Sequence, residues 1–268
     1  MSGKGQPDFT RLRKRADFYL VRHGESVANR DQLIQGRQNA PLSEKGRTHA
    51  RAAGAWFSGK RIDAVYCSPL DRAAETAQII CATAGYPAPI PDARIIELDT
   101  GLFSGLGYEE IRVRFPAEWN RFQAESWEAV PEAERVASLR ARAFDYWGHL
   151  IDMANQGKRS VVTVSHAGMI QWLIKATLGS TRWMPLFAAS NCGIFHFAAQ
   201  PVRGGQSRGG KSRGTSAEVL PLPGVQSARE SSVETLLSGE PDLTGEGDGD
   251  SPVVGCFGEW RLMNFVPY

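Results

Sequence analysis

The feature that most constrains this chain is a regular alternation of short apolar runs with segments of helical periodicity. The apolar runs are rich in β-branched and aromatic residues, as in strands buried on both faces, and occupy residues 17–21, 62–67 and 160–164. Helices are expected between and after them, over residues 43–57, 69–84, 133–154 and 167–178. This order predicts an α/β fold, a three-layer α/β/α sandwich with a mainly parallel central sheet.

Local signals place several element ends. Ser43 is the expected N-cap of one helix, and Gly85-Tyr86-Pro87 is expected to end the next. Further strands are predicted at residues 94–96, 194–197 and 259–263.

The 268 residues allow one large domain or two small ones. Residues 200–255 are rich in Gly, Ser and Pro, basic in their first part and acidic in their second. Such a tract cannot bury enough apolar surface to offset its ordering entropy. It is therefore predicted to be a disordered, low-complexity insertion within a single domain formed by residues 16–199 and 256–268. Residues 1–15 are predicted to be a basic, flexible arm.

Composition argues against several classes of protein. The 31 Lys and Arg nearly balance the 29 Asp and Glu, so no strong field favours nucleic acid. No run approaches the roughly 18 apolar residues of a membrane span, and the basic N-terminus lacks the apolar region of a secretory signal. Four distant cysteines are expected to be free thiols rather than metal ligands. The expected location is cytoplasmic.

Residues 205–212 match the GxxxxGK[ST] phosphate-loop pattern. That pattern binds phosphate only when a helix N-terminus follows the loop directly. Pro221 and Pro223 follow instead, so we interpret the match as chance and expect no nucleotide cofactor.

Five chemically competent side chains of three kinds, Arg, His and Glu, follow predicted strands. Arg22 and His23 end the first, Arg72 follows the second, and Glu97 and His166 follow two more. Ligands bind outside the carboxyl ends of strands in open parallel sheets. Guanidiniums bind a phosphoryl dianion, imidazole can attack phosphorus, and a carboxylic acid can protonate the departing oxygen. The set predicts phosphoryl transfer.

Five motifs in order resemble the histidine phosphatase superfamily, the phosphoglycerate-mutase-like enzymes, and specifically its phosphatase branch. They are Arg22-His23-Gly24-Glu25 with Asn29, Gln35-Gly36 followed by Pro41-Leu42-Ser43-Glu44-Lys45-Gly46, Ser68-Pro69-Leu70-Asp71-Arg72-Ala73, Glu97 with Gly101 and Gly105, and Ser165-His166-Ala167-Gly168.

The resemblance implies a role for each matched residue. His23 is the expected nucleophile that forms a phosphohistidine, and Glu97 is the expected general acid and base. The residues expected to bind substrate are Arg22, Asn29, Gln35, Gly36, Arg72, His166 and Ala167. The resemblance implies a small phosphorylated substrate, no metal and no cofactor, because the arginines supply the positive charge.

Two alternatives stay open. A 2,3-bisphosphoglycerate-dependent mutase would use the same residues under a longer lid, and the 69-residue separation of Glu97 and His166 looks short for one. A regulatory or scaffold member would instead bind a protein partner through residues 200–255. The acid loop carries Phe103-Ser104 where many family phosphatases have Trp-Glu, which leaves the substrate unassigned. The sequence does not indicate an oligomeric state.

Two groups of side chains allow two interpretations each. An aromatic set either forms a lid over the pocket or packs in a helical core; it comprises Phe115, Trp119, Phe122 and Trp127. An arginine set either binds a second anionic group of the substrate or lies on a solvated helix face; it comprises Arg112, Arg114 and Arg121.

Overall fold

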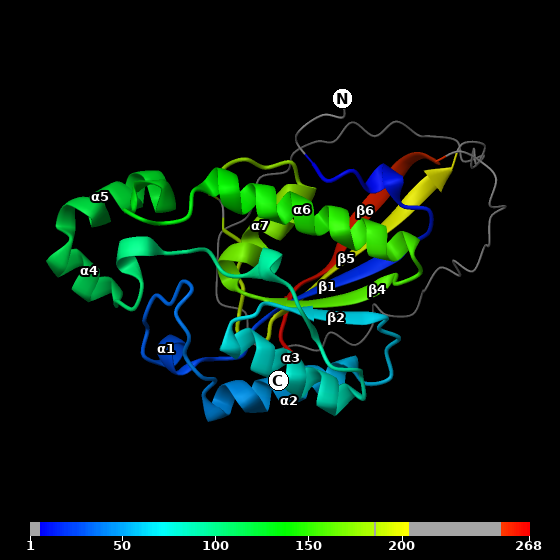
Figure 1. Ribbon diagram of the computed structural model, residues 1–268, viewed down its shortest axis with the longest axis horizontal. Coiled ribbons are helices and arrows are strands. Elements are labelled where there is room, and N and C mark those ends of the chain that lie inside the picture. Colours follow the sequence, from blue (N-terminus) through cyan, green and yellow to red (C-terminus); the bar gives the residue numbers. More distant parts are fainter. Residues whose placement is uncertain (1–5, 185, 204–252) are drawn as a thin grey trace, which may run out of the picture. The chain divides into compact units, whose positions relative to one another are not determined.

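A six-stranded sheet forms the centre of the fold in the computed structural model, which describes residues 6–184, 186–203 and 253–268 (Figure 1). The strands are β1 Ala16–Arg22, β2 Ala64–Cys67, β3 Ile90–Pro91, β4 Ser160–Ser165, β5 Ile194–Arg203 and β6 Val253–Phe265. Their order in the sheet is β3-β2-β4-β1-β5-β6, so β1 is central. The β1–β4, β4–β2 and β2–β3 pairs are parallel and β5 is antiparallel to β1, which confirms the mainly parallel sheet.

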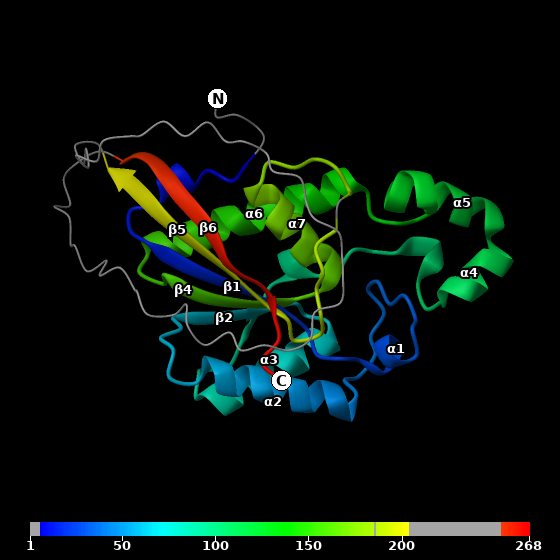
Figure 2. The same ribbon diagram turned by 180° about the vertical axis from the view of Figure 1, so that it is seen from behind.

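Helices cover both faces of the sheet. The described helices are α1 Val27–Arg30, α2 Glu44–Phe57, α3 Asp71–Ala84, α4 Tyr108–Arg114, α5 Pro116–Glu125, α6 Val136–Asn155 and α7 Ala167–Thr177, and four of them cover the sheet. Helices α2 and α3 pack on one face, and α6 and α7 on the other (Figures 1 and 2). Alternate residues of β1 supply the two cores: Phe18 and Leu20 face α6 and α7, while Val21 faces α2 and α3. The three-layer α/β/α sandwich is therefore as predicted.

The capping signals produce the helix ends that the sequence predicts. The Ser43 side chain accepts a hydrogen bond from the Gly46 N–H at the start of α2. Gly85 ends α3 with a φ of 77°, a left-handed conformation that favours glycine.

The predicted strand at residues 94–96 is wrong. Residues Ala93–Ile95 form a 3-10 helix, η2, and the edge strand β3 precedes it at Ile90–Pro91. The Asp92 carboxylate accepts hydrogen bonds from both the backbone and the guanidinium of Arg94. This local side-chain-to-backbone bonding stabilises a turn in place of an extended strand.

The structure also differs from the expected solvated arm over residues 7–15. Residues Phe9–Arg11 form a 3-10 helix, η1, and Leu12 is fully buried. The Phe9 ring contacts Trp147 of α6 and Phe197 of β5, with ring centroids 5.3 and 5.2 Å apart. Burial of these two apolar side chains holds the segment against the core.

Strands occupy both ends of the range predicted to be an insertion, because β5 extends to Arg203 and β6 begins at Val253. The segment between them, including the phosphate-loop match at 205–212, lies outside the described residues. A partner for residues 200–255 therefore stays a prediction. The described residues within 6–184, 186–202 and 253–268 form one compact unit.

All four cysteines are free thiols, three of them buried. Burial raises the pKa of Cys67 and of Cys81 to about 11, so both stay protonated and unreactive at neutral pH. Within the described ranges, no helix combines the length and the hydrophobicity needed to cross a bilayer.

Candidate active site

His23 follows the last residue of β1 and is 3% exposed. Its Nδ1 lies 2.7 Å from the Gly24 carbonyl oxygen, which can only accept, so Nδ1 carries the ring proton. The Nε2 atom accepts a hydrogen bond from the Arg72 Nε at 3.3 Å. Both contacts select the same tautomer, in which the Nε2 lone pair points toward the arginine and is available to attack.

Arg72 lies in the first turn of α3 and is 1% exposed. Its two terminal nitrogens donate to the carbonyl oxygens of Gln38 and Gly36, each at 2.7 Å. Burial lowers its pKa to about 10, so the side chain still carries a positive charge at neutral pH. The carbonyl groups orient the guanidinium without neutralising its charge.

Arg22 is held in the same way at the end of β1. Its NH1 donates to the Ala189 carbonyl oxygen at 2.6 Å, and its buried Nε has no hydrogen-bond partner among the described residues. Burial lowers the pKa of Arg22 from its ordinary value. In the described part of the chain, neither Arg22 nor Arg72 forms an ion pair with a carboxylate. Two positive charges therefore stand beside His23 without a directly paired carboxylate, and the more distant Glu97 carboxylate offsets only part of the effect of burial on their pKa values.

The second histidine comes from the end of β4. The His166 ring lies 5.0 Å from the His23 ring between centroids, and its Nε2 is 2.8 Å from the Ser68 hydroxyl. Its Nδ1 is buried and has no hydrogen-bond partner within the described ranges. Burial, strengthened by the nearby arginines, holds the pKa of both histidines well below the ordinary 6.5. Both rings are therefore neutral at physiological pH.

Glu97 follows η2 in the chain, and its carboxylate reaches the first turn of α7, where backbone amides orient it. Leu98 N–H donates to Oε1 at 2.8 Å, Met169 N–H to Oε1 at 3.1 Å, and Gly168 N–H to Oε2 at 3.2 Å. A Cβ atom at position 168 would lie 2.6 Å from the Glu97 Oε1, so glycine is required for this close approach.

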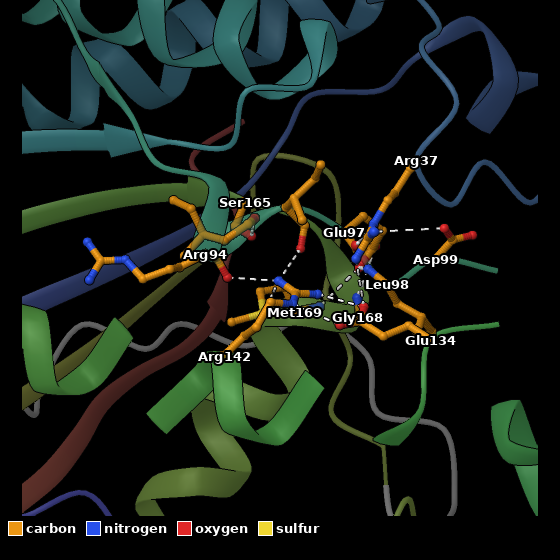
Figure 3. A network of polar contacts seen from close by, with 12 residues as sticks. Arg37, Arg94, Glu97, Leu98, Asp99, Glu134, Arg142, Ser165, Gly168 and Met169 are labelled. Atoms are coloured by element: carbon orange, nitrogen blue, oxygen red, sulfur yellow. Dashed lines mark hydrogen bonds and ion pairs between the residues drawn. The ribbon is translucent and has the colours of Figure 1, made fainter. Parts of the chain in front are cut away.

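A second layer of ion pairs holds the Glu97 loop (Figure 3). Arg142 of α6 donates from Nε and NH2 to both carboxylate oxygens of Glu134, at 2.8 and 2.7 Å. Its NH1 donates to the carbonyl oxygens of Arg94 and Ile96, at 2.8 and 3.0 Å. Arg37 completes the layer by donating to the Glu97 carbonyl oxygen and to Glu134. Arg142 and Arg37 therefore bond to the carbonyl oxygens of residues 94, 96 and 97.

The predicted residues meet at one cavity of about 620 Å³. Eight of the nine line it: Arg22, His23, Asn29, Gln35, Gly36, Arg72, Glu97 and Ala167. The ninth, His166, is not among the lining residues, but its ring lies against the ring of His23. Gln35 accepts from the Ser26 hydroxyl, and Asn29 accepts from the Asn191 side chain, which also donates to the His23 carbonyl oxygen. The two amides are thus tied to the loops around the nucleophile.

Sequence reasoning missed several residues of the site. Ser68, the partner of His166, lies in a predicted motif but has no role assigned from sequence, and its position four residues before Arg72 is the signal that could have identified it. The pair Arg142–Glu134 has no local signal, because only the tertiary fold brings it to Glu97. Trp183 and Phe187 also line the cavity, from an irregular segment between α7 and β5.

Comparison with known proteins agrees with this geometry. Residues 18–204 match the family model described as the histidine phosphatase superfamily (branch 1). A 2,3-bisphosphoglycerate-dependent phosphoglycerate mutase from Bartonella bacilliformis is 33% identical over 174 residues, which cover 62% of this chain and 82% of that protein. One from Brucella ovis is 32% identical over 184 residues, 65% and 87% of the two chains.

Solved structures share the fold. Bacillus stearothermophilus YhfR superimposes with a TM-score of 0.60 at 27% identity, over 68% of this chain and 90% of its own. A mycobacterial glucosyl-3-phosphoglycerate phosphatase, in complex with VO3, gives a TM-score of 0.60 at 24% identity, over 69% and 93% of the two chains.

Proposed function

The chain belongs to the histidine phosphatase superfamily, and from this premise we propose that it is a metal-independent phosphatase. It hydrolyses a phosphate monoester through a phosphohistidine intermediate on His23. The observation that carries the proposal is the pair of guanidiniums beside His23, the buried Arg72 and the partly buried Arg22, which are held by carbonyl oxygens and form no ion pair with a described carboxylate. A phosphoryl dianion supplies the negative charge that these groups lack.

Binding of the phosphoryl group uses the atoms that have no partner in the described chain. The Nε of Arg22 and the Nδ1 of His166 are both buried and unpartnered. When the Ser68 hydroxyl donates to the Nε2 of His166, the Nδ1 carries the ring proton and can donate to a phosphoryl oxygen. The arginines stabilise the charge on the equatorial oxygens in the transition state.

In the first step, the lone pair of His23 Nε2 forms a bond to phosphorus as the ester P–O bond breaks. Glu97 is the only carboxyl group among the described residues that line the cavity, so we assign it the proton that the departing alkoxide takes up. In the second step, Glu97 accepts a proton from water. The hydroxide attacks phosphorus, the P–N bond breaks, and inorganic phosphate leaves with neutral His23 restored.

Hydrolysis of p-nitrophenyl phosphate in EDTA tests this proposal. The wild type should turn over with EDTA present, His23→Ala should lose at least about 1,000-fold in kcat, and acid quenching should trap a phosphoenzyme in the wild type only. His149→Gln is the matched control, because His149 of α6 packs against Tyr66 of β2 and does not line the cavity. Activity that EDTA abolishes, or that survives in His23→Ala, would refute the proposal.

Mutase activity is the second candidate, because the curated relatives described above are named as phosphoglycerate mutases. A mutase returns the phosphoryl group of the phosphohistidine to a substrate hydroxyl in place of water. Incubation with 3-phosphoglycerate, with and without 2,3-bisphosphoglycerate as primer, separates the two. Primer-dependent conversion to 2-phosphoglycerate that exceeds phosphate release would assign a mutase and refute the hydrolase.

A further inference from the structure

The cavity carries its positive charge only at the phosphoryl end. Among the described residues that line it, the cationic side chains are Arg22 and Arg72, and both contact the His23 region. The other arginines suggested by the sequence do not line the cavity. Arg112 and Arg114 are exposed and pair with Glu109 and Glu110 on the solvent face of α4. The alternative of a second anion-binding group on these residues is therefore not supported.

The cavity also has a wall of apolar and aromatic side chains, which we call the apolar wall: Leu33, Tyr108, Phe122, Trp127, Trp183 and Phe187. The polar side chains of Gln32, Thr100 and Gln171 line the cavity as well, but they carry no charge. Three rings of the apolar wall form a chain. The Phe122 and Trp127 rings lie 4.9 Å apart between centroids, and Trp127 and Trp183 lie 6.5 Å apart. Such a surface stabilises a bound apolar group by removing it from water and by ring-to-ring contact.

Packing within the protein holds Phe122 and Trp127 of the apolar wall in place. Phe122 and Trp127 also pack in a small core around Phe103, Ile111 and Val130, under α4 and α5. The two interpretations of these aromatic residues therefore combine: Phe122 and Trp127 line the cavity, while Phe115 and Trp119 pack in that core without lining it. A preformed wall loses little conformational entropy on binding.

From this distribution of charge we propose that the substrate is a phosphate monoester of an uncharged, apolar alcohol, ring-sized or larger. The proposal rests on the proposed phosphatase function and names its substrate class. The cavity of about 620 Å³ is within the usual range for sites that enclose drug-sized ligands. A carboxylate or second phosphate on the alcohol would be buried against the apolar wall without a described cation, and an unpaired buried charge is strongly unfavourable.

Binding of matched phosphonates tests the substrate class without requiring turnover. Calorimetry compares 4-methylbenzylphosphonate with 4-carboxybenzylphosphonate, which are similar in size and differ in charge. The methyl compound should bind at least about tenfold more tightly, since one uncompensated buried charge exceeds the 1.4 kcal/mol of a tenfold change. Equal affinities, or tighter binding of the carboxylate, would overturn the proposal.

Two variants locate the effect in the cavity. Leu186 lines the cavity and is half exposed, so Leu186→Arg adds a cation there without disturbing the core. It should reduce the preference for the methyl compound at least fivefold, a change of about 1 kcal/mol. Val113→Arg adds the same charge at an exposed site on α4 outside the cavity and should leave the preference unchanged. Equal effects of both variants would overturn the proposal.

The two phosphonates, together with the ester 4-methylphenyl phosphate, distinguish a failure of this proposal from a failure of the phosphatase assignment. Preferential binding of the methyl compound by a wild type that does not hydrolyse 4-methylphenyl phosphate would leave the substrate class standing and refute the hydrolysis. Failure of both phosphonates to bind would refute the anion site, and with it both proposals.

Discussion

The loop that carries Glu97 depends on Arg142, and this dependence gives a quantitative prediction for Arg142→Met. The substitution keeps an apolar stem of similar length and removes the guanidinium. Five hydrogen bonds are lost: two to Glu134, one each to the Arg94 and Ile96 carbonyl oxygens, and a weak one to the Met169 sulfur. The Glu134 carboxylate, whose side chain is 9% exposed, keeps only its contact with Arg37.

The expected loss of stability follows from burial. Breaking a buried ion pair by removing one partner destabilises by about 3–5 kcal/mol, whereas an exposed pair contributes about 0–1 kcal/mol. The Arg142 side chain is 20% exposed and Arg37 still contacts Glu134, so we expect a decrease of about 3 kcal/mol in the free energy of unfolding. The matched control, Arg112→Met, removes an exposed pair on α4 and should change it by less than about 0.5 kcal/mol.

Urea unfolding at pH 7.5 measures the stability change, and leaving-group dependence measures the effect on Glu97. An alkyl phosphate needs a proton on its departing oxygen, while p-nitrophenolate leaves without one. A displaced Glu97 should therefore lower kcat for the alkyl ester at least about tenfold more than for p-nitrophenyl phosphate. If Arg142→Met has the same free energy of unfolding as Arg112→Met, and the same ratio of kcat for the two esters, the reasoning is refuted.

Three further predictions concern the two site histidines, Gly168 and Leu12. Because burial holds the pKa of His23 and of His166 well below 6.5 in the native state, the unfolded chain binds protons first as the pH falls through 6.5; the free energy of unfolding should drop by about 1 kcal/mol for each histidine between pH 7.5 and 5.5, and urea unfolding that shows no loss on acidification would contradict this. Gly168→Ala places a Cβ against Glu97 and should lower kcat for an alkyl phosphate by about tenfold or more; an unchanged kcat in steady-state assays would show that Glu97 is not the proton donor. Leu12→Ala removes a fully buried side chain and should lower the free energy of unfolding by about 2–4 kcal/mol. A decrease of less than about 0.5 kcal/mol in thermal unfolding would show that Leu12 is exposed to solvent and not packed on the core.

The elements that sequence predicts well are those whose signals are local. Ser43 caps α2 and Gly85 ends α3, because each acts on backbone groups within a few residues. Residues 94–96 mislead for a related reason: their apolar character favours a strand, but the Asp92 side chain bonds to Arg94 and stabilises a turn. Leu12 sits in a run of basic residues, and only the docking of the segment on the core reveals its burial.

The residues of the candidate site likewise divide into those that local sequence signals predict and those that only the tertiary fold reveals. Arg22, His23 and His166 stand at strand ends, so the pattern of strands alone brings them to one edge of the sheet. The carbonyl groups that orient Arg72 belong to a loop that carries no helical or strand periodicity. The apolar wall comes from separate segments that only the tertiary fold brings together, which is why the substrate class required the structure.

The central position of β1 has a consequence for how the protein is made. Its described neighbours in the sheet are β4 and β5, which begin at Ser160 and Ile194. A ribosome releases β1 first, so its backbone has neither of these partners until most of the described chain has been synthesised. Phe18 and Leu20, which pack against residues of α6 and α7 in the folded protein, lack those partners through that interval. His23 directly follows β1, so its site is complete only after β4 and α7, which bring His166 and Gly168, have been synthesised.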